Sequence, residues 1–383
     1  MTEDFTIRTV DKIREIPSSL WNGLRPDDHP FVSHEFLSAL EESGSATSET
    51  GWLPMHLVLE QNGNILGVAP MYLKGHSQGE YVFDHSWADA YERAGGRYYP
   101  KLQLAVPFSP VTGPRFLCGH GPAEELLHRK TLLAQGAKQV AVKYGLSSVH
   151  ATFLQKEDTK AFTDQDYLLR VGEQFHWFND GYDTFDAFLN ALSSRKRKAI
   201  RKERKPENFA DLTFETLTDK EITSTHWDAF FEFYMDTGSR KWGIPYLNRE
   251  FFDILGATLG PQIVLMMVKR EGRYIAGALN LVSQDCLYGR YWGCIEDHRF
   301  LHFETCYYRA IEYAIEQKLD RVEAGAQGPH KLARGYLPTK TYSAHWMQDP
   351  GFHDAISDFL QRETRHMDAE LAYLGKLSPF KKS

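Results

Sequence analysis

The segment EAGAQGPHKLARGYLP, residues 323 to 338, concentrates side chains that transfer protons or bind anions. A carboxylate, a carboxamide, an imidazole, two cationic groups and a phenol stand beside glycine and proline residues that interrupt regular structure. Lysine and arginine suit a phosphate or carboxylate, which arginine binds through two parallel hydrogen bonds. We predict a loop that lines a binding site, in which His330, Lys331 and Arg334 hold an anion. A solvated loop face is the alternative.

Polar and aromatic side chains also gather in the first half, in DHSWADAYERAGG from residue 84. Acidic and aromatic side chains at this density in a loop line pockets for an amine or a sugar. The alternative is a capped connection packed by its own rings. The substrate-binding residues predicted here are Asp84, His85, Trp87, Asp89 and Tyr91.

Two further candidates, His302 and Glu304, open a predicted helix in the second half, where free backbone amides favour anions. For Glu304 the alternative is a residue that simply complements the helix dipole. Cys294, His298 and His302 lack the spacing of an H-E-x-x-H site, so the sequence predicts no metal.

The run RKRKAIRKERK, residues 195 to 205, is strongly basic in a chain whose net charge is -7. Apolar residues at helical spacing, from Phe185 to Ile200 and including Ala199, predict an amphipathic basic helix. Such a helix attracts phosphate, tRNA or anionic lipid headgroups, or is a solvated face. The predicted basic patch comprises Arg195, Lys196, Arg197, Lys198, Arg201 and Lys202.

An internal repeat organises these groups. Residues 56–74 and 264–283 each have two apolar runs around a polar glycine turn, which predicts a β-hairpin. A helix and then a strand follow in each half, from Ala123 and from Phe303. Because the order of elements matches as well, we infer two α/β domains related by duplication rather than a chance similarity.

The last strand of the second repeat, RVEAGAQ from Arg321, alternates apolar and polar positions. Val322 and Ala324 face the predicted core, and Glu323 and Gln327 point to the other side. In the first repeat, SVHATF places His150 where Glu323 stands.

Composition limits the class of protein. A chain of 383 residues with 42% hydrophobic and 25% charged residues is typical of globular domains. The net charge of -7 argues against a general nucleic-acid binder. The four cysteines have no CxxC spacing, the N-terminus lacks a secretory signal, and no apolar run approaches the roughly 20 residues of a transmembrane helix. We expect a cytoplasmic protein.

Several segments together resemble a known family over nearly the whole chain. They are FVSHEFLSALEESG, DHSWADAY, YYPKLQLAVPFSPVTGPRFL, RYWGC, LHFETCYYRAIEYAI, EAGAQGPHKLARGY and SAHW. The sequence is similar to the FemAB-like, peptidoglycan biosynthesis or recognition branch of the GNAT acyltransferase superfamily. The resemblance implies an α/β fold of two tandem GNAT-like domains with mixed sheets. We expect these at residues 1–170 and 171–383, the second with a basic lead-in helix and a C-terminal helix.

The resemblance implies an N-acyltransferase or aminoacyltransferase that moves an activated acyl group to a substrate amine. Acyl transfer to an amine needs a base, donors to the carbonyl oxygen and an anchor for the donor molecule. We assign the base to Glu323, oxyanion stabilisation to Gln327 and nearby amides, and protonation of the leaving group to Tyr336. A structural ion pair with Arg321 or Arg334 is the alternative for Glu323, and a packed ring for Tyr336.

The donor stays undecided between acyl-CoA and aminoacyl-tRNA. The sequence departs from CoA-binding members because neither late helix follows a Q/R-x-x-G-x-G/A phosphate loop. The acceptor is a small-molecule or peptide amine, with tRNA or another anionic phosphate ligand at the basic helix. The alternative function is a non-catalytic GNAT-fold module that recognises a peptidoglycan fragment or other anionic ligand.

Overall fold

The computed structural model describes residues 5–241, 245–325 and 328–381. Contacts divide the chain into two compact units. Unit 1 comprises Met1–Gly172 and Lys340–Ala369, and unit 2 comprises Glu173–Thr339 and Glu370–Ser383. Residues 340–369 belong to unit 1, whereas the sequence analysis expected residues 171–383 to form one domain.

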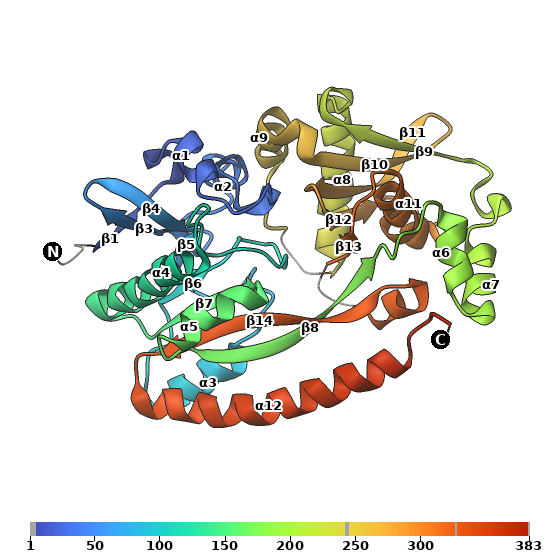
Figure 1. Ribbon diagram of the computed structural model, residues 1–383. Helices are drawn as coiled ribbons and strands as arrows, with labels where there is room; N and C mark the ends of the chain where they lie inside the picture. The colour runs from blue at the N-terminus through green and yellow to red at the C-terminus, as the bar shows by residue number, and fades with distance from the viewer. Residues whose placement is uncertain (1–4, 242–244, 326–327, 382–383) are drawn as a thin grey trace. The chain divides into compact units, whose positions relative to one another are not determined.

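The strands of unit 1 form two groups (Figure 1). One is a small antiparallel sheet in the order β1-β3-β4, made of β1 (Phe5–Val10), β3 (His56–Gln61) and β4 (Asn64–Ala69). The other has the order β2-β5-β6-β7-β14, made of β2 (Trp52–Pro54), β5 (Met71–Lys74), β6 (Lys101–Leu104), β7 (Ser148–Leu154) and β14 (Leu337–Met347). Strands β6 and β7 are parallel, and their neighbours pair antiparallel.

The helices of unit 1 are α1 (Ser18–Gly23), α2 (His34–Glu42), α3 (His85–Arg93), α4 (Ala123–Tyr144), α5 (Thr159–Thr163) and α12 (Pro350–Lys376), which belongs to unit 1 up to Ala369. Helix α4 ends at Gly145, whose left-handed conformation (φ 62°) suits glycine. Its apolar face, with Leu133 and Ala137, packs on Leu102 and Val149 of β6 and β7. Burial of these side chains holds one face of the sheet against α4.

The strands of unit 2 are β8 (Leu168–Phe178), β9 (Leu212–Thr218), β10 (Ile263–Arg270), β11 (Arg273–Val282), β12 (Cys286–Cys294) and β13 (Arg321–Glu323). Their order is β8-β13-β12-β11-β10-β9, and only β12 and β13 are parallel among these pairs. The chain passes from unit 1 to unit 2 within β8 and returns within β14.

The helices of unit 2 are α6 (Phe185–Ala191), α7 (Ser194–Glu203), α8 (Ser224–Lys241), α9 (Arg249–Leu259), α10 (Leu301–Phe303) and α11 (Arg309–Glu316). A π-helical turn, η7 (Glu304–Tyr308), connects α10 to α11. Helix α11 packs Ile311 and Ala314 against one face of the sheet. Helix α8 lies against the opposite face so closely that a Cβ added to Gly293 would stand 2.3 Å from the Phe233 carbonyl oxygen.

The predicted repeat is present in both units. Hairpins β3–β4 and β10–β11 turn at Asn62-Gly63 and Glu271-Gly272, all four with positive φ, as two-residue type I′ turns require. Each hairpin has a register shift at the same place, where the second strand carries one extra residue, Leu66 or Ile275. A helix and a strand that joins a parallel pair complete each unit, namely α4 with β7 and α11 with β13.

Several local predictions need correction. The segment after Asp84 is a helix, α3, and not a loop. The basic segment forms two helices, α6 and α7, which meet at Leu192 and Ser193, and Ala199 is exposed rather than part of an apolar stripe. Strand β13 ends at Glu323 and is shorter than predicted. In the described part of the chain, no helix is long and apolar enough to cross a membrane.

Candidate functional site

Glu323 lies in unit 2 where two parallel strands part. Strands β12 and β13 pair through three residue pairs that end at Tyr288 and Glu323, and β12 then continues to Cys294. The Glu323 side chain is only 4% exposed. Arg321 Nε donates to its Oε1 at 3.1 Å, and the Oε2 atom accepts no hydrogen bond from any described residue. The carboxylate is thus fixed on one oxygen, and its other oxygen is buried without a hydrogen bond from any described residue.

A histidine faces this carboxylate from the next strand. His176 of β8 is in register with Glu323, and its Nε2 atom lies 4.0 Å from Glu323 Oε2. The same nitrogen is 3.0 Å from Gln174 Oε1. Burial lowers the pKa of His176, although the Glu323 charge opposes this shift. The imidazole is therefore neutral at physiological pH.

Lys331 supplies a buried cation near the same strand end. It belongs to the 3-10 turn η8 (Pro329–Arg334) and is 2% exposed. Its Nζ donates to the Gly325 carbonyl oxygen at 2.9 Å, and no carboxylate of a described residue forms an ion pair with it. Burial lowers its pKa to about 8, so the ammonium form still predominates at neutral pH. We name Glu323, His176 and Lys331 the strand-end site.

The other residues predicted in this loop have different surroundings. Arg334 is ion-paired with Glu203 of α7 at 2.9 Å and covers the Phe303 ring at 3.4 Å. Tyr336 is fully buried with its hydroxyl 3.5 Å from the Tyr307 carbonyl oxygen, and burial raises its pKa well above the usual value. These contacts favour an ion pair for Arg334 and a packed ring for Tyr336.

His330, by contrast, is exposed, and its Nε2 atom lies 2.9 Å from the Tyr307 hydroxyl oxygen. Gln327, the predicted oxyanion donor, lies outside the described residues.

The two candidates at the start of the late helix also differ. Glu304 is 3% exposed and forms ion pairs with Arg204 at 2.8 Å and with Arg309 at 3.2 Å. It therefore ties α7 to the π-helical turn, which favours a structural role. His302 is partly exposed and stacks edge-on against Tyr307, with ring centroids 5.3 Å apart.

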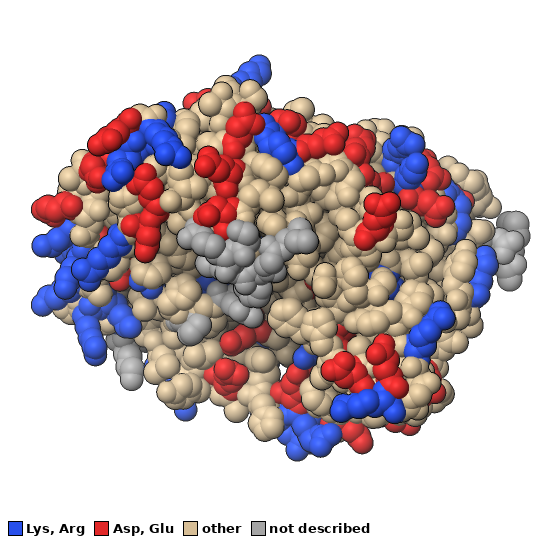
Figure 2. All heavy atoms as spheres, turned by 180° about the vertical axis from the view of Figure 1, so that it is seen from behind, with Lys and Arg blue, Asp and Glu red and all other residues tan. Residues whose placement is uncertain are grey.

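The predicted basic patch lies on α7 in unit 2. Figure 2 shows Lys and Arg side chains gathered at the left edge of the molecule, the end where α7 lies. Arg195, Lys198, Arg201 and Lys202 are exposed, and Lys196 and Arg197 are partly exposed. Arg201 contacts Asp186 at 3.3 Å, and this pair is itself exposed. The patch therefore presents its charge to solvent.

Unit 1 holds a second group of polar side chains, which is more deeply buried. Lys101 of β6 is fully buried and donates to Ser77 Oγ at 2.9 Å, Glu80 Oε2 at 2.8 Å and Asp84 Oδ2 at 2.5 Å. Burial alone would raise the pKa of Asp84, but the Lys101 ammonium holds it well below its usual range. Lys74 is equally buried, 3.6 Å above the Trp52 ring, and burial lowers its pKa to about 7.

Of the five residues predicted in the first half, two turn inward. Asp84 joins Lys101, and Trp87 packs against His345 with ring centroids 4.9 Å apart. His85 and Asp89 are exposed on the outer face of α3, and Tyr91 stacks on Phe352. The helical period explains this division, because only one face of α3 meets the unit.

Sequence reasoning missed Lys101, Glu80, His176 and His345 as members of these groups. Charged residues are usually exposed, so nothing in isolation marked Lys101 or Glu80 as buried. The dipeptide His-Trp at residues 176–177 and 345–346 was no specific signal, because it also occurs at residues 226–227, in helix α8.

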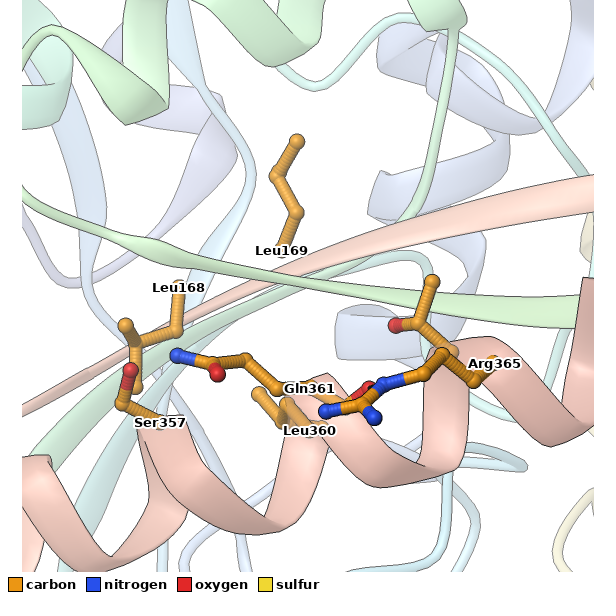
Figure 3. A pocket seen from close by; sticks show the side chains of 7 residues that line it. Leu168, Leu169, Ser357, Leu360, Gln361 and Arg365 are labelled. Atoms are coloured by element: carbon orange, nitrogen blue, oxygen red, sulfur yellow. Dashed lines mark hydrogen bonds between the residues drawn. The ribbon is translucent and has the colours of Figure 1, made fainter.

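Two shallow pockets lie elsewhere. One of about 440 Å³ lies between the start of β8 and α12, where Figure 3 shows Leu168 and Leu169 of the strand with Ser357, Leu360, Gln361 and Arg365 of the helix. The other, of about 490 Å³, lies beside α6 and α7 and includes Arg201, Arg204 and Glu312. Within the described ranges, no group of three or more His, Cys, Asp or Glu residues is placed to hold a metal ion.

Comparisons with known proteins identify the family. A family model described as peptidoglycan biosynthesis/recognition, FemAB-like, matches residues 12–382. The structure of FemX is similar with a TM-score of 0.56 and 12% sequence identity, over 92% of this chain and 100% of that chain. L-PGS from Bacillus licheniformis gives a TM-score of 0.52 and 12% identity, over 88% and 98% of the two chains.

The C-terminal domain of a putative lysylphosphatidylglycerol synthetase from Agrobacterium fabrum has a TM-score of 0.51 and 10% identity, over 85% of this chain and 90% of that chain. None of the curated protein sequences matches the chain. The similarities confirm the predicted fold class, α/β with two tandem GNAT-like units and mixed sheets. With nearly its whole length matched by the family model, the chain belongs to the FemAB-like family of peptidoglycan biosynthesis or recognition proteins.

Proposed function

We propose that the protein is an N-acyltransferase or aminoacyltransferase, with its reactive centre at the strand-end site of unit 2. One observation carries the proposal: Glu323 is buried where β12 and β13 part, with one oxygen bound by Arg321 and the other without a hydrogen bond from any described residue. A buried carboxylate with one oxygen free of hydrogen bonds can accept a proton at that oxygen. Lys331 adds a cation that has no carboxylate partner among the described residues.

The reaction follows from these positions. The amine nitrogen attacks the acyl carbonyl carbon, a C–N bond forms, and the bond from that carbon to the donor's sulfur or oxygen breaks. Glu323 Oε2 accepts the proton that the amine loses, and the leaving thiolate or alkoxide finally takes up a proton. Lys331 stabilises the negative charge of the carbonyl oxygen or of an anionic group on the substrate. Arg321 is a positioning residue that keeps Glu323 in place.

The acceptor that fits the family is an amine on a peptidoglycan precursor, and the donor is an acyl-CoA or an aminoacyl-tRNA. The exposed cations of α7 support the tRNA donor, because a polyanion binds where several cations face solvent. Native mass spectrometry against acyl-CoAs and bulk charged tRNA would identify which donor binds.

Replacing Glu323 by Gln tests the assignment of the base. The amide keeps the shape and can still meet Arg321, but it accepts no proton at neutral pH. We expect kcat for acyl transfer to fall by about 10²–10⁴-fold. Glu316→Gln, an exposed residue of α11, is the matched control and should keep full activity. An E323Q variant that folds and retains wild-type kcat would refute the assignment.

One observation favours the alternative, a recognition module without turnover. Tyr336, the predicted proton donor to the leaving group, is fully buried with its hydroxyl 3.5 Å from the Tyr307 carbonyl oxygen, which leaves that catalytic role unfilled. Such a module would bind a peptidoglycan fragment and form no product with any acyl donor.

A further inference from the structure

The two units share an arrangement of four side chains on adjacent strands. In unit 2, β8 carries Gln174 and His176, and β13 carries Arg321 and Glu323, with His176 opposite Glu323. On each strand the two residues are two positions apart and so lie on one face. The His176 nitrogen contacts Gln174 on its own strand, and Arg321 contacts Glu323 on the other.

Unit 1 repeats this pattern with different residue types. Strand β14 carries Ser343 and His345, and β7 carries Ser148 and His150, with His345 opposite His150. His345 Nε2 is 2.8 Å from Ser343 Oγ, and His150 Nε2 is 2.8 Å from Ser148 Oγ. The two rings meet directly, with their Nδ1 atoms 2.8 Å apart. Ser343, His345 and His150 therefore form a connected row of a serine, a base and a group that orients the base.

The hydrogen-bond chain continues to a carboxylate. His150 Nε2 is 3.2 Å from the Tyr98 hydroxyl, which donates to Asp84 Oδ2 at 2.7 Å. Asp84 is held in its anionic form by Lys101, and burial lowers the pKa of His150 to about 3 and that of His345 well below its usual value. Both imidazoles are neutral, so each has one donor and one acceptor nitrogen.

The Asp84 charge and the contact of Tyr98 with His150 indicate the direction of the hydrogen bonds in the chain. Ionised Asp84 only accepts, so the Tyr98 hydroxyl donates to it, and His150 Nε2–H is shared between the hydroxyl oxygens of Tyr98 and Ser148. His150 Nδ1 is then an acceptor, and His345 Nδ1–H donates a hydrogen bond to it. His345 Nε2 is left as an acceptor, and the Ser343 hydroxyl donates to it. This is the arrangement of a serine whose proton a histidine can remove.

A strand irregularity supports a role for Ser343 beyond packing. Tyr342 pairs with Leu154 and Ala344 with Ala151, so that two residues of β7, Thr152 and Phe153, stand opposite Ser343 alone. Phe153 has a φ of 57°, a left-handed conformation that is uncommon for a phenylalanine. Bulges and such strained residues are enriched beside active sites.

We propose that unit 1 contains a second reactive centre, in which Ser343 is the nucleophile, His345 its base and His150 the positioning residue, and that it accepts an acyl group from an activated ester or thioester. A bond forms between Ser343 Oγ and the acyl carbon, and the bond from that carbon to the leaving oxygen or sulfur breaks. The serine proton moves to His345 Nε2 and is returned to the leaving group. The product is an acyl-serine, and no oxidant or reductant is required.

Reaction with p-nitrophenyl acetate tests the proposal without any amine acceptor. The full chain is treated with the ester, release of p-nitrophenolate is recorded, and peptide mapping by mass spectrometry locates the acetyl group. We expect acetylation of Ser343 and none of Ser148, because the bonding pattern makes the Ser148 hydroxyl an acceptor from His150. His345→Gln should slow acetylation of Ser343 by about 10²-fold or more.

Ser109→Ala is the matched control, because Ser109 is also buried in unit 1 and its hydroxyl has no hydrogen-bond partner among the described residues. It should leave acetylation of Ser343 unchanged. Mapping of the wild-type chain decides the question even where a variant misfolds. The proposal would be overturned if the wild-type chain carried no acetyl group on Ser343, or if Ser148 were acetylated equally. The hydrogen bond between Ser343 and His345 would then be only a structural contact. Neither result touches the assignment of Glu323.

Discussion

Lys331 of the strand-end site has a pKa that burial lowers to about 8. Desolvation penalises the ammonium form, and the single hydrogen bond to Gly325 offsets only part of the cost. Because its pKa is about 8, the group is a cation at neutral pH and loses its charge in mildly alkaline solution. Anion binding at this site should therefore weaken as the pH rises through 8.

The same shift makes stability depend on pH in a defined window. In the unfolded chain the lysine pKa is about 10.4, so between about pH 8 and 10 the unfolded state binds more protons than the folded state. The free energy of unfolding then rises with pH, by at most about 1.4 kcal/mol per pH unit from this group. Lys331→Met should remove this contribution. Urea unfolding of the wild type and of Lys331→Met from pH 7 to 10 measures this contribution. If the free energies of unfolding of the two proteins changed with pH in parallel, the prediction would be wrong.

We expect Lys101 to contribute to the stability of the fold more than to a reaction. Replacing it by Met would leave the Glu80 and Asp84 carboxylates buried and uncompensated. Breaking a buried ion pair from one side costs about 3–5 kcal/mol. Urea unfolding should show that loss for Lys101→Met, whereas Lys160→Met, in an exposed pair with Asp164, should cost less than about 1 kcal/mol. Equal effects of the two substitutions would show that the buried group contributes no more than a surface pair.

At the scale of elements, the two hairpins allow a matched comparison. Asn62 and Glu271 occupy the same position of a type I′ turn with φ of 50° and 51°. Asparagine tolerates this left-handed conformation, whereas glutamate is strained there. Glu271→Asn should raise the free energy of unfolding by roughly 0.5–1 kcal/mol, and Asn62→Glu should lower it by a similar amount. Both residues are exposed, so chemical denaturation reports the turn and not a change in packing. The prediction would be wrong if neither substitution changed the free energy of unfolding.

The same hairpins show what the sequence predicts well. Glycine turns between apolar runs are local signals, so both hairpins and the helix–strand units after them were predictable. The helix α3 was missed because it spans only His85–Arg93 and buries just Trp87 and Ala88, too little for a clear helical period.

Part of the site was predictable for the same reason. The alternation in strand β13 correctly separated Glu323 from the apolar Val322, although both are buried. The pairing of Glu323 with His176, and of His150 with His345, depends on strand neighbours far apart in the chain, which no local pattern reveals. For the same reason the partner of Arg334, Glu203, could not be foreseen.

At the scale of the whole molecule, charge is unevenly distributed. The chain is acidic overall, yet α7 presents exposed cations (Figure 2). If charged tRNA is the donor, Arg195, Lys198 and Lys202 together should bind its phosphates. Replacing all three by Ser should reduce the slope of log K against log salt by about 0.7–0.9 for each phosphate that the protein no longer neutralises.

Fluorescence anisotropy with tRNA at several salt concentrations measures that slope. Lys220→Ser with Lys318→Ser is the control, since both lysines are exposed in unit 2 and lie outside α7. If the slope of log K against log salt changed equally in the α7 variant and the control, or changed in neither, α7 would be excluded as the binding surface.

The central claim, acyl transfer to an amine, is tested most directly by looking for its product. The purified chain would be incubated with a panel of acyl-CoAs and charged tRNAs together with amine-bearing peptidoglycan precursors, and the precursors weighed by mass spectrometry. The account predicts a precursor heavier by one acyl or aminoacyl group, formed by the wild type and greatly reduced with Glu323→Gln. Tight binding of the precursor with no product from any donor would contradict it and identify a recognition module instead.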